Sequence, residues 1–324
     1  MFGFGKKKSN KTSSATDTRD LVANTLTTMN VPYHVDYDVD GNPFELQYQG
    51  GNFIISALKD SKFIDIYYLG FYSVPKYDVD DLSRFYRTVN HLNANSDVAL
   101  FYGEHEEDEE VYISSYKNIL FVPEITNIDA YLASQLQLFF RVHRTFLTEM
   151  DRQRVKEEFR KIVERQPEIG GSKNNLIGGL YVAAYFMAVY KAAPDLVNEE
   201  VFDGLIKAVC DSDIFRKMNE KKEFFSKKNI STRNRLQSDP EFNSYAENWK
   251  YTFSYDMQAM ECTIIYTRCA ICEMARRENC FHLMKYLCTT DFAQQKLMGN
   301  TLIRTKTIGN GDEICDFHII KGRT

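Results

Sequence analysis

The chain of 324 residues has no cysteine before Cys210, so thiol chemistry is confined to its C-terminal half. All seven cysteines follow, and six of them lie between Cys262 and Cys315. An odd number of cysteines fits free thiols in a reducing compartment better than a disulfide framework. We therefore expect a reduced, cytoplasmic protein with seven titratable thiols.

A net positive charge and an apolar run long enough to span a membrane are also absent. The formal net charge of -5 argues against a broad phosphate-binding face, so we expect no nucleic-acid partner. The lysines of Met1–Lys8 are followed by no apolar run, so the sequence predicts no signal peptide. The longest apolar run, Leu176–Tyr190, contains two glycines and ends before Lys191, whereas a membrane span needs about 20 apolar residues. We expect a buried helix there and no membrane segment.

The length and composition predict a globular chain with two cores. Hydrophobic residues make up 44% of the sequence and charged residues 26%, and 324 residues exceed the size of a usual single core. Residues 1–15 are mainly small, polar or basic, so we expect a disordered tail. The strand-rich pattern ends near Phe121, and we place the domain boundary near Met150, giving domains 16–150 and 151–324. The helices on either side of this boundary could form one continuous rod.

Residues 16–150 predict a two-layer α/β domain with an antiparallel meander. The expected order is helix, three strands, helix, two strands and a long helix, with strands at 44–48, 53–55, 63–69, 98–102 and 111–116 and helices at 17–30, 80–92 and from 128. This order, with an asparagine at Asn90 or Asn93, resembles the YbjN family, which shares the fold of type III secretion chaperones. The resemblance implies a domain that binds a partner chain.

Two charged segments each allow two interpretations. The acidic run Glu104–Glu110 is either a cation site or a solvated hairpin loop, and the loop is favoured because adjacent carboxylates repel. The basic residues Lys227, Lys228, Arg233 and Arg235 form either an anion patch or a solvated lid or loop, and the lid or loop is favoured.

Residues 151–324 predict a mostly helical domain closed by a small antiparallel sheet, so the fold class of the chain is α+β. Helices are expected at 151–166, 176–192, 201–218, 269–277, 281–287 and 290–298. A β-branched segment at 262–268 predicts a strand. Segments 301–308 and 313–320 predict a closing hairpin on the turn Gly309–Asp312. Trp249 begins an aromatic segment expected to pack over the core or line a pocket.

Four motifs follow one another in this domain, namely Arg268-Cys269, Cys288-Thr-Thr-Asp291, Arg304-Thr305-Lys306-Thr307 and Cys315-Asp316-Phe317. Their order resembles the L-2-amino-thiazoline-4-carboxylic acid hydrolase family, although Ala270 stands where that family often has proline. The resemblance implies a hydrolase that opens a C–N or C–S bond in a small heterocyclic amino acid.

The predicted hairpin should bring Arg304 and Thr305 close to Cys315 and Asp316. Hydrolysis needs a nucleophile or activated water, an acid and a base. The candidate catalytic residues are Cys288, Asp291, Cys315 and Asp316. The candidate substrate-binding residues are Arg304, Arg268, Cys269 and Thr305. Either arginine suits a substrate carboxylate, Cys269 is a further candidate nucleophile, and His318 is either a partner that orients Asp316 or an exposed edge residue.

Each cysteine can also be a small buried core residue. Cys269 and Cys272 form a C-x-x-C pair, which is half of a zinc site or a redox pair, but no second pair is present. We predict no cofactor; a zinc site would need further ligands from Cys262, Cys280, His282, Cys288 or Cys315. The alternative function is a non-catalytic sensor of a small ligand or metal, since vinyl-4-reductase-like sensor domains look distantly similar. A homodimer is compatible with either function.

Overall fold

A computed structural model of the protein describes residues 17–104 and 109–322. The described residues form two compact units, one ending at Met150 and the other beginning at Asp151. Each unit combines helices with one antiparallel sheet, which confirms the predicted α+β class. The predicted disordered tail and the central part of the acidic run lie outside the described residues.

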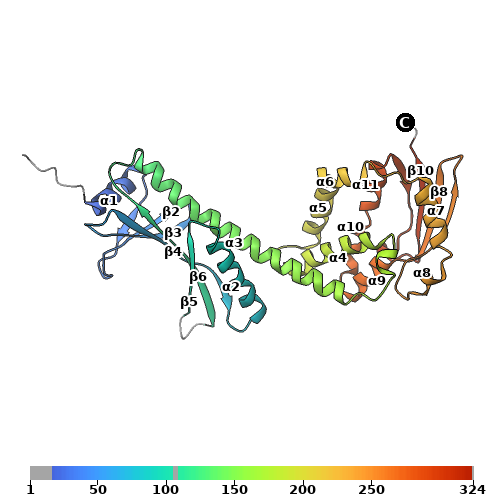
Figure 1. Ribbon diagram of the computed structural model, residues 1–324, viewed down its shortest axis with the longest axis horizontal. Coiled ribbons are helices and arrows are strands. Elements are labelled where there is room, and N and C mark those ends of the chain that lie inside the picture. Colours follow the sequence, from blue (N-terminus) through green and yellow to red (C-terminus); the bar gives the residue numbers. More distant parts are fainter. Residues whose placement is uncertain (1–16, 105–108, 323–324) are drawn as a thin grey trace, which may run out of the picture. The chain divides into compact units, whose positions relative to one another are not determined.

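The first unit contains a six-stranded antiparallel sheet with the strand order β1-β2-β3-β4-β6-β5 (Figure 1). Its elements are α1 (Thr18–Thr28), β1 (Tyr33–Val35), β2 (Phe44–Tyr48), β3 (Gly51–Ala57), β4 (Phe63–Pro75), α2 (Val79–Asn93), β5 (Ala99–Glu104), β6 (Glu110–Leu120) and the start of α3 (Ile128–Glu164). The short β1 was not predicted, because its three residues are mostly exposed and do not alternate.

Alternation builds this sheet, and a helical stripe covers it. In β3 every second residue is buried, including Phe53 and Ile55, which is the pattern of a strand with one face on a core. In α3, Leu132, Leu136 and Phe139 are fully buried at helical spacing. The first core therefore forms between one face of this sheet and helix α3.

The second unit contains a four-stranded antiparallel sheet with the order β7-β8-β10-β9. Its elements after α3 are η1 (Gly171–Lys173), α4 (Ile177–Ala192), α5 (Glu199–Cys210), α6 (Asp213–Asn219), α7 (Lys227–Leu236), α8 (Pro240–Ser244), β7 (Lys250–Asp256), β8 (Glu261–Arg268), α9 (Ala270–Arg277), η2 (Phe281–Leu283), α10 (Met284–Leu287), α11 (Thr290–Leu297), β9 (Asn300–Ile303), η3 (Ile308–Asn310) and β10 (Cys315–Lys321). Trp249 is buried in the core of this unit, next to the start of β7.

Helix α3 runs without a break through the residue at which the units divide. Its first part packs in the core of the first unit. In its last part, Ile162 is buried in the core of the second unit, and Val155, Phe159 and Val163 pack against that core. The two helices predicted on either side of Met150 are therefore one helix.

Two predictions about secondary structure in the second unit were wrong. The helix predicted at 201–218 is divided into α5 and α6, because Ser212 caps α6 by accepting a hydrogen bond from the Phe215 amide. The basic segment predicted as a lid or loop is helix α7, whose cap is Ser226. Within it Arg233 lies over the ring of Phe224, at 5.1 Å from the centroid.

The closing hairpin is looser than predicted. Strand β9 ends at Ile303, and β10 begins only at Cys315. Thr305 and Lys306 follow β9, and their amides donate hydrogen bonds to the side chain of Asp316 in β10. The turn η3 lies between Lys306 and β10. Side-chain acceptors thus replace ladder bonds where the hairpin was expected to continue. No helix in the described ranges is both long and apolar enough to cross a membrane.

Candidate active site

The Cys269 thiol lies at the N-terminus of helix α9, where Cys269 is the N-cap residue. The side chain is half-buried. The Cys272 thiol and the backbone amides of Ile271 and Cys272 lower the pKa of Cys269 in spite of burial. The neighbouring Cys269 sulfur and burial raise the pKa of Cys272. The C-x-x-C pair therefore has one acidic and one neutral thiol.

Asp291 lies in the first turn of α11 and binds Arg304. Its Oδ2 accepts from Arg304 Nη1 at 2.7 Å, and Arg304 Nη2 donates to the Cys288 carbonyl at 2.8 Å. Only 6% of the Arg304 side chain is exposed, against 37% of Asp291. Burial raises the pKa of Asp291 more than the charges of Arg304 and Arg233 lower it. The Asp291 carboxyl is therefore partly exposed and has a raised pKa.

The Arg304 guanidinium is held between two aromatic rings as well as by its polar partners. Its central carbon lies 4.8 Å from the ring centroid of Phe292 and 5.1 Å from that of Phe317. With Asp291 and the Cys288 carbonyl as acceptors, Arg304 is engaged in orienting the carboxyl.

The thiols of Cys288 and Cys315 lie near this pair, and both are neutral. Cys315 Sγ accepts from the Ile308 amide at 3.2 Å, and Thr307 Oγ1 lies 3.5 Å away. Burial raises the pKa of Cys288 to about 12 and also raises that of Cys315. Asp291 in its ionised form also raises the pKa of Cys288. Cys269 is therefore the best thiolate of the three candidate nucleophiles.

Tyr266 connects these groups and was missed by the sequence reasoning. It lies on β8 opposite Cys315 in β10, and its ring packs against Phe317 at 5.4 Å. Its hydroxyl accepts a hydrogen bond from Arg233 Nη1 at 3.3 Å. Burial raises the pKa of Tyr266, and the charges of Asp291 and Cys269 act in the same direction. The only available sequence signal was its position shortly before Arg268-Cys269.

Asp316 and Thr305 bind each other and lie apart from the thiol cluster. Thr305 donates to Asp316 through its amide at 2.9 Å and its hydroxyl at 2.5 Å. Successive side chains of a strand point to opposite faces, so Asp316 faces away from Cys315 and Phe317. The expected proximity of Thr305 to Asp316 is present, whereas Arg304 is bound to Asp291 rather than Asp316.

Two further predicted residues have other partners. Arg268 Nε donates to the Asn248 carbonyl at 2.7 Å, and Nη2 donates to the Tyr245 carbonyl at 3.2 Å. His318 Nε2 lies 3.3 Å from Glu261 Oε2 and its side chain is 40% exposed, which favours the exposed edge residue of the two interpretations of His318. The structure thus groups Cys269, Cys288, Asp291, Arg304 and Cys315, and it separates Arg268, Thr305 and Asp316 from them.

The zinc alternative gains no support from the donor geometry. Within the described part of the chain, no three or more histidine, cysteine, aspartate or glutamate side chains are arranged to hold a metal ion. All seven cysteines are free thiols.

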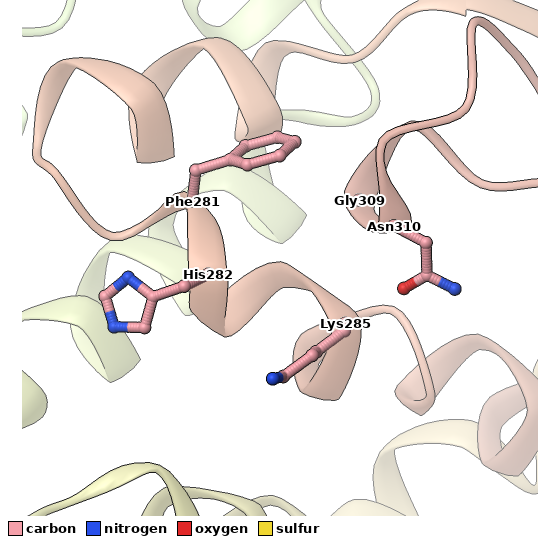
Figure 2. A pocket seen from close by; sticks show the side chains of 5 residues that line it. All are labelled: Phe281, His282, Lys285, Gly309 and Asn310. Atoms are coloured by element: carbon pink, nitrogen blue, oxygen red, sulfur yellow. The ribbon is translucent and has the colours of Figure 1, made fainter.

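A pocket of about 380 Å³ borders the cluster and is lined by Phe281, His282, Lys285, Gly309 and Asn310 (Figure 2). The ring of Phe281 extends toward the Gly309–Asn310 turn (Figure 2). Gly309 also adjoins Cys288, since a Cβ added to Gly309 would be 2.7 Å from the Cys288 sulfur. Gly309 therefore lies next to both the pocket and the thiol.

These observations define a cysteine-centred site in an α+β domain. Residues 178–319 match the model of the L-2-amino-thiazoline-4-carboxylic acid hydrolase family. The match contains every residue of the cluster, and it supports a hydrolase-like function for this part of the chain. No curated protein matches the sequence.

A similar solved structure is the crystal structure of YbjN from E. coli, which resembles the N-terminal region. It is 11% identical, with a TM-score of 0.30, and the similarity covers 42% of this chain and 93% of YbjN. The matched hydrolase family is the one that the four sequence motifs resemble.

Proposed function

We propose that residues 151–324 form a hydrolase domain that opens a C–N or C–S bond in a small heterocyclic amino acid similar to L-2-amino-thiazoline-4-carboxylate. The observation that carries the proposal is the grouping of the Cys269 thiol at the start of α9 with the Asp291 carboxyl, which Arg304 holds at 2.7 Å. Cys269 has a lowered pKa, and the nearby Asp291 has a raised one. A nucleophile and an acid whose environments shift them in opposite directions are the groups that such hydrolysis needs.

In the proposed reaction, the Cys269 thiolate attacks the ring carbon between nitrogen and sulfur. A Cys269 S–C bond forms, the C=N electron pair moves to the ring nitrogen, and that nitrogen takes the proton of Asp291. The ring C–N or C–S bond then breaks with its electron pair on the leaving nitrogen or sulfur, while a lone pair of the exocyclic amino group forms an amidinium on the carbon that stays on Cys269. Water attacks this carbon, its first proton returns to the Asp291 carboxylate, and its second proton passes to the nitrogen or sulfur that left the ring. The new C–O bond replaces the bond to Cys269, the thiolate leaves, and the net change is the addition of one water.

Arg304 acts on this reaction through Asp291. Its bond at 2.7 Å fixes the carboxyl, and its charge limits the rise in the Asp291 pKa. We do not assign Arg304 to the substrate carboxylate, because its donors already have acceptors.

The test is hydrolysis of L-2-amino-thiazoline-4-carboxylate by the full chain and by single variants. We expect Cys269→Ser and Asp291→Asn each to lower kcat at least about 100-fold, the usual size of a nucleophile or acid–base contribution. Cys210→Ser is the matched control for the thiol, because Cys210 lies on α5 outside the cluster. Asp316→Asn is the control for the carboxyl.

Alkylation adds a readout that does not depend on the substrate. Iodoacetamide should label Cys269 first, because the pKa of every other cysteine is raised. Full activity in Cys269→Ser would refute the proposal. Loss of activity in Asp316→Asn but not in Asp291→Asn would instead support Asp316 as the acid. A folded protein that binds the substrate without turnover would support the sensor alternative.

For the first unit we propose that it binds a partner chain. Phe63 and Leu120 are opposite each other on β4 and β6, and both are nearly half exposed. Apolar side chains on an open sheet face support such a role.

A further inference from the structure

Arg233 is a half-buried guanidinium with few partners. On α7 it lies over Phe224, and Nη1 donates to the Tyr266 hydroxyl at 3.3 Å. Its Nε is buried and has no hydrogen-bond partner. Among the residues the structure describes, no carboxylate lies within ion-pair distance of Arg233. A charged group taken from water without an opposite charge costs free energy, so an arginine in this environment suits an anionic ligand.

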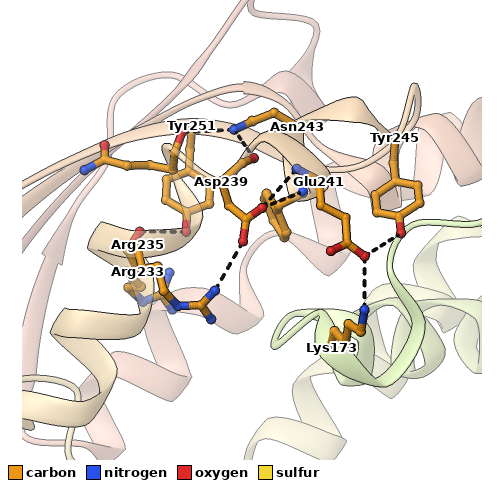
Figure 3. A network of polar contacts seen from close by, with 10 residues as sticks. Lys173, Arg233, Arg235, Asp239, Glu241, Asn243, Tyr245 and Tyr251 are labelled. Carbon is orange, nitrogen blue, oxygen red and sulfur yellow. Dashed lines mark hydrogen bonds and ion pairs between the residues drawn. The ribbon is translucent and has the colours of Figure 1, made fainter.

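The other arginines near the site are already bound. Arg304 is held by Asp291 and the Cys288 carbonyl, and Arg268 by two backbone carbonyls. On the same helix, Arg235 is bonded to Asp239 at 3.2 Å (Figure 3). Of these four arginines, Arg233 is therefore the one with donors left free.

The backbone of Arg233 is held in place by a hydrogen bond from Tyr251. The Tyr251 hydroxyl donates to the Arg233 carbonyl at 3.1 Å, which joins α7 to β7 (Figure 3). Tyr266 accepts from Arg233, so its own hydroxyl proton remains available, since the described residues provide no acceptor for it. A guanidinium and a phenol thus form a pair of donors at the end of β8, shortly before Cys269.

We propose that Arg233, with the Tyr266 hydroxyl as a second donor, binds the carboxylate of the substrate. This inference rests on the proposed hydrolase function and assigns the anion-binding role to a residue outside the four motifs. The planar guanidinium can bind a carboxylate through two parallel hydrogen bonds. The ligand class is a small heterocycle that carries a carboxylate, and an uncharged heterocycle would lack the group that Arg233 recognises.

Binding can be measured without turnover by using two aromatic probes that resist ring opening. These are 2-aminothiazole-4-carboxylate and 2-aminothiazole, which lacks the carboxylate. By calorimetry, the wild-type full chain should bind the carboxylate probe at least tenfold more tightly. Arg233→Met should remove this preference and leave affinity for 2-aminothiazole unchanged. Arg233→Lys should give an intermediate affinity, and Tyr266→Phe should weaken the carboxylate probe alone.

Arg235→Met is the matched control and should bind both probes like the wild type. The melting temperature of Arg233→Met should equal or exceed that of the wild type, because an unpaired cation is replaced by an apolar side chain of similar length. The inference is overturned if the wild type shows no carboxylate preference, if Arg233→Met keeps that preference, or if Arg233→Met unfolds. The two proposals can fail separately. Loss of catalysis in Cys269→Ser supports the hydrolase proposal, and the carboxylate preference of probe binding in that variant still tests the Arg233 proposal.

Discussion

At the scale of single residues, His143 is the clearest buried titratable group in the first unit. Only 8% of it is exposed, its Nε2 lies 2.7 Å from Ser115 Oγ, and its ring stacks on Phe71 at 3.8 Å. Burial lowers the pKa of His143 to about 4. The ring is therefore neutral in the folded protein at neutral pH.

This pKa predicts an acid-sensitive first unit. The unfolded histidine titrates near 6.5, above the folded value, so between pH 6.5 and 4 the unfolded state binds more protons. The free energy of unfolding should fall by about 3 kcal/mol across that window and should not change above it through this group. Urea titrations of the full chain should show the loss by circular dichroism, whereas Trp249 fluorescence reports the second unit. In His143→Gln this part of the pH dependence should disappear, and an unchanged slope would contradict the assignment.

At the scale of elements, the turn η3 is fitted closely against α10. A Cβ added to Gly309 would lie 2.7 Å from Cys288 Sγ and 3.2 Å from Met284 Cβ, closer than side chains normally approach. Gly204 on α5 has no atom within 4 Å of an added Cβ. The two glycines therefore differ in their tolerance of a methyl group.

Gly309→Ala should lower the free energy of unfolding by about 1–3 kcal/mol, because the short Cys288 side chain can move only by disturbing the cluster. Gly204→Ala should raise it by up to about 1 kcal/mol, since alanine favours a helix interior. Urea unfolding followed by Trp249 fluorescence measures both changes. If Gly309→Ala raised the free energy of unfolding as much as Gly204→Ala does, η3 would have to shift without cost.

At the scale of the whole molecule, each unit has its own core, and α3 contributes to both. The end of α3 is also bound by charge within the second unit. Glu278 has a side chain that is 2% exposed, and it accepts from Arg165 at 2.6 Å and from Lys191 at 2.7 Å. The second unit therefore needs the last turns of α3.

We predict that a fragment of residues 151–324 folds alone and keeps the activity of the full chain. A fragment of residues 167–324 should not fold, because it lacks Phe159, Ile162 and Arg165. Circular dichroism, melting curves and substrate hydrolysis of both fragments test this. An unfolded 151–324 fragment would mean that the units depend on each other.

The order and class of most elements could be predicted from the sequence, as could the four motifs from which the candidate site is drawn. Alternation at 44–48 and 63–69 and the helical spacing after Ile128 are local patterns, so they could be recognised without a structure. The motifs also located Cys269, Asp291 and Arg304, since these residues lie within short conspicuous segments.

Which of these residues contact one another follows only from the fold. Arg304 binds Asp291 rather than Asp316, because β10 turns Asp316 to the other sheet face and α11 brings Asp291 to the guanidinium. The Cys272 thiol and the amides of α9 lower the pKa of Cys269, whereas burial raises the pKa of Cys288 and of Cys315. Arg233 contacts Tyr266 only because α7 packs on β7 and β8. Burial, strand facing and the partner of a charge depend on segments far apart in the chain, which local sequence patterns do not encode.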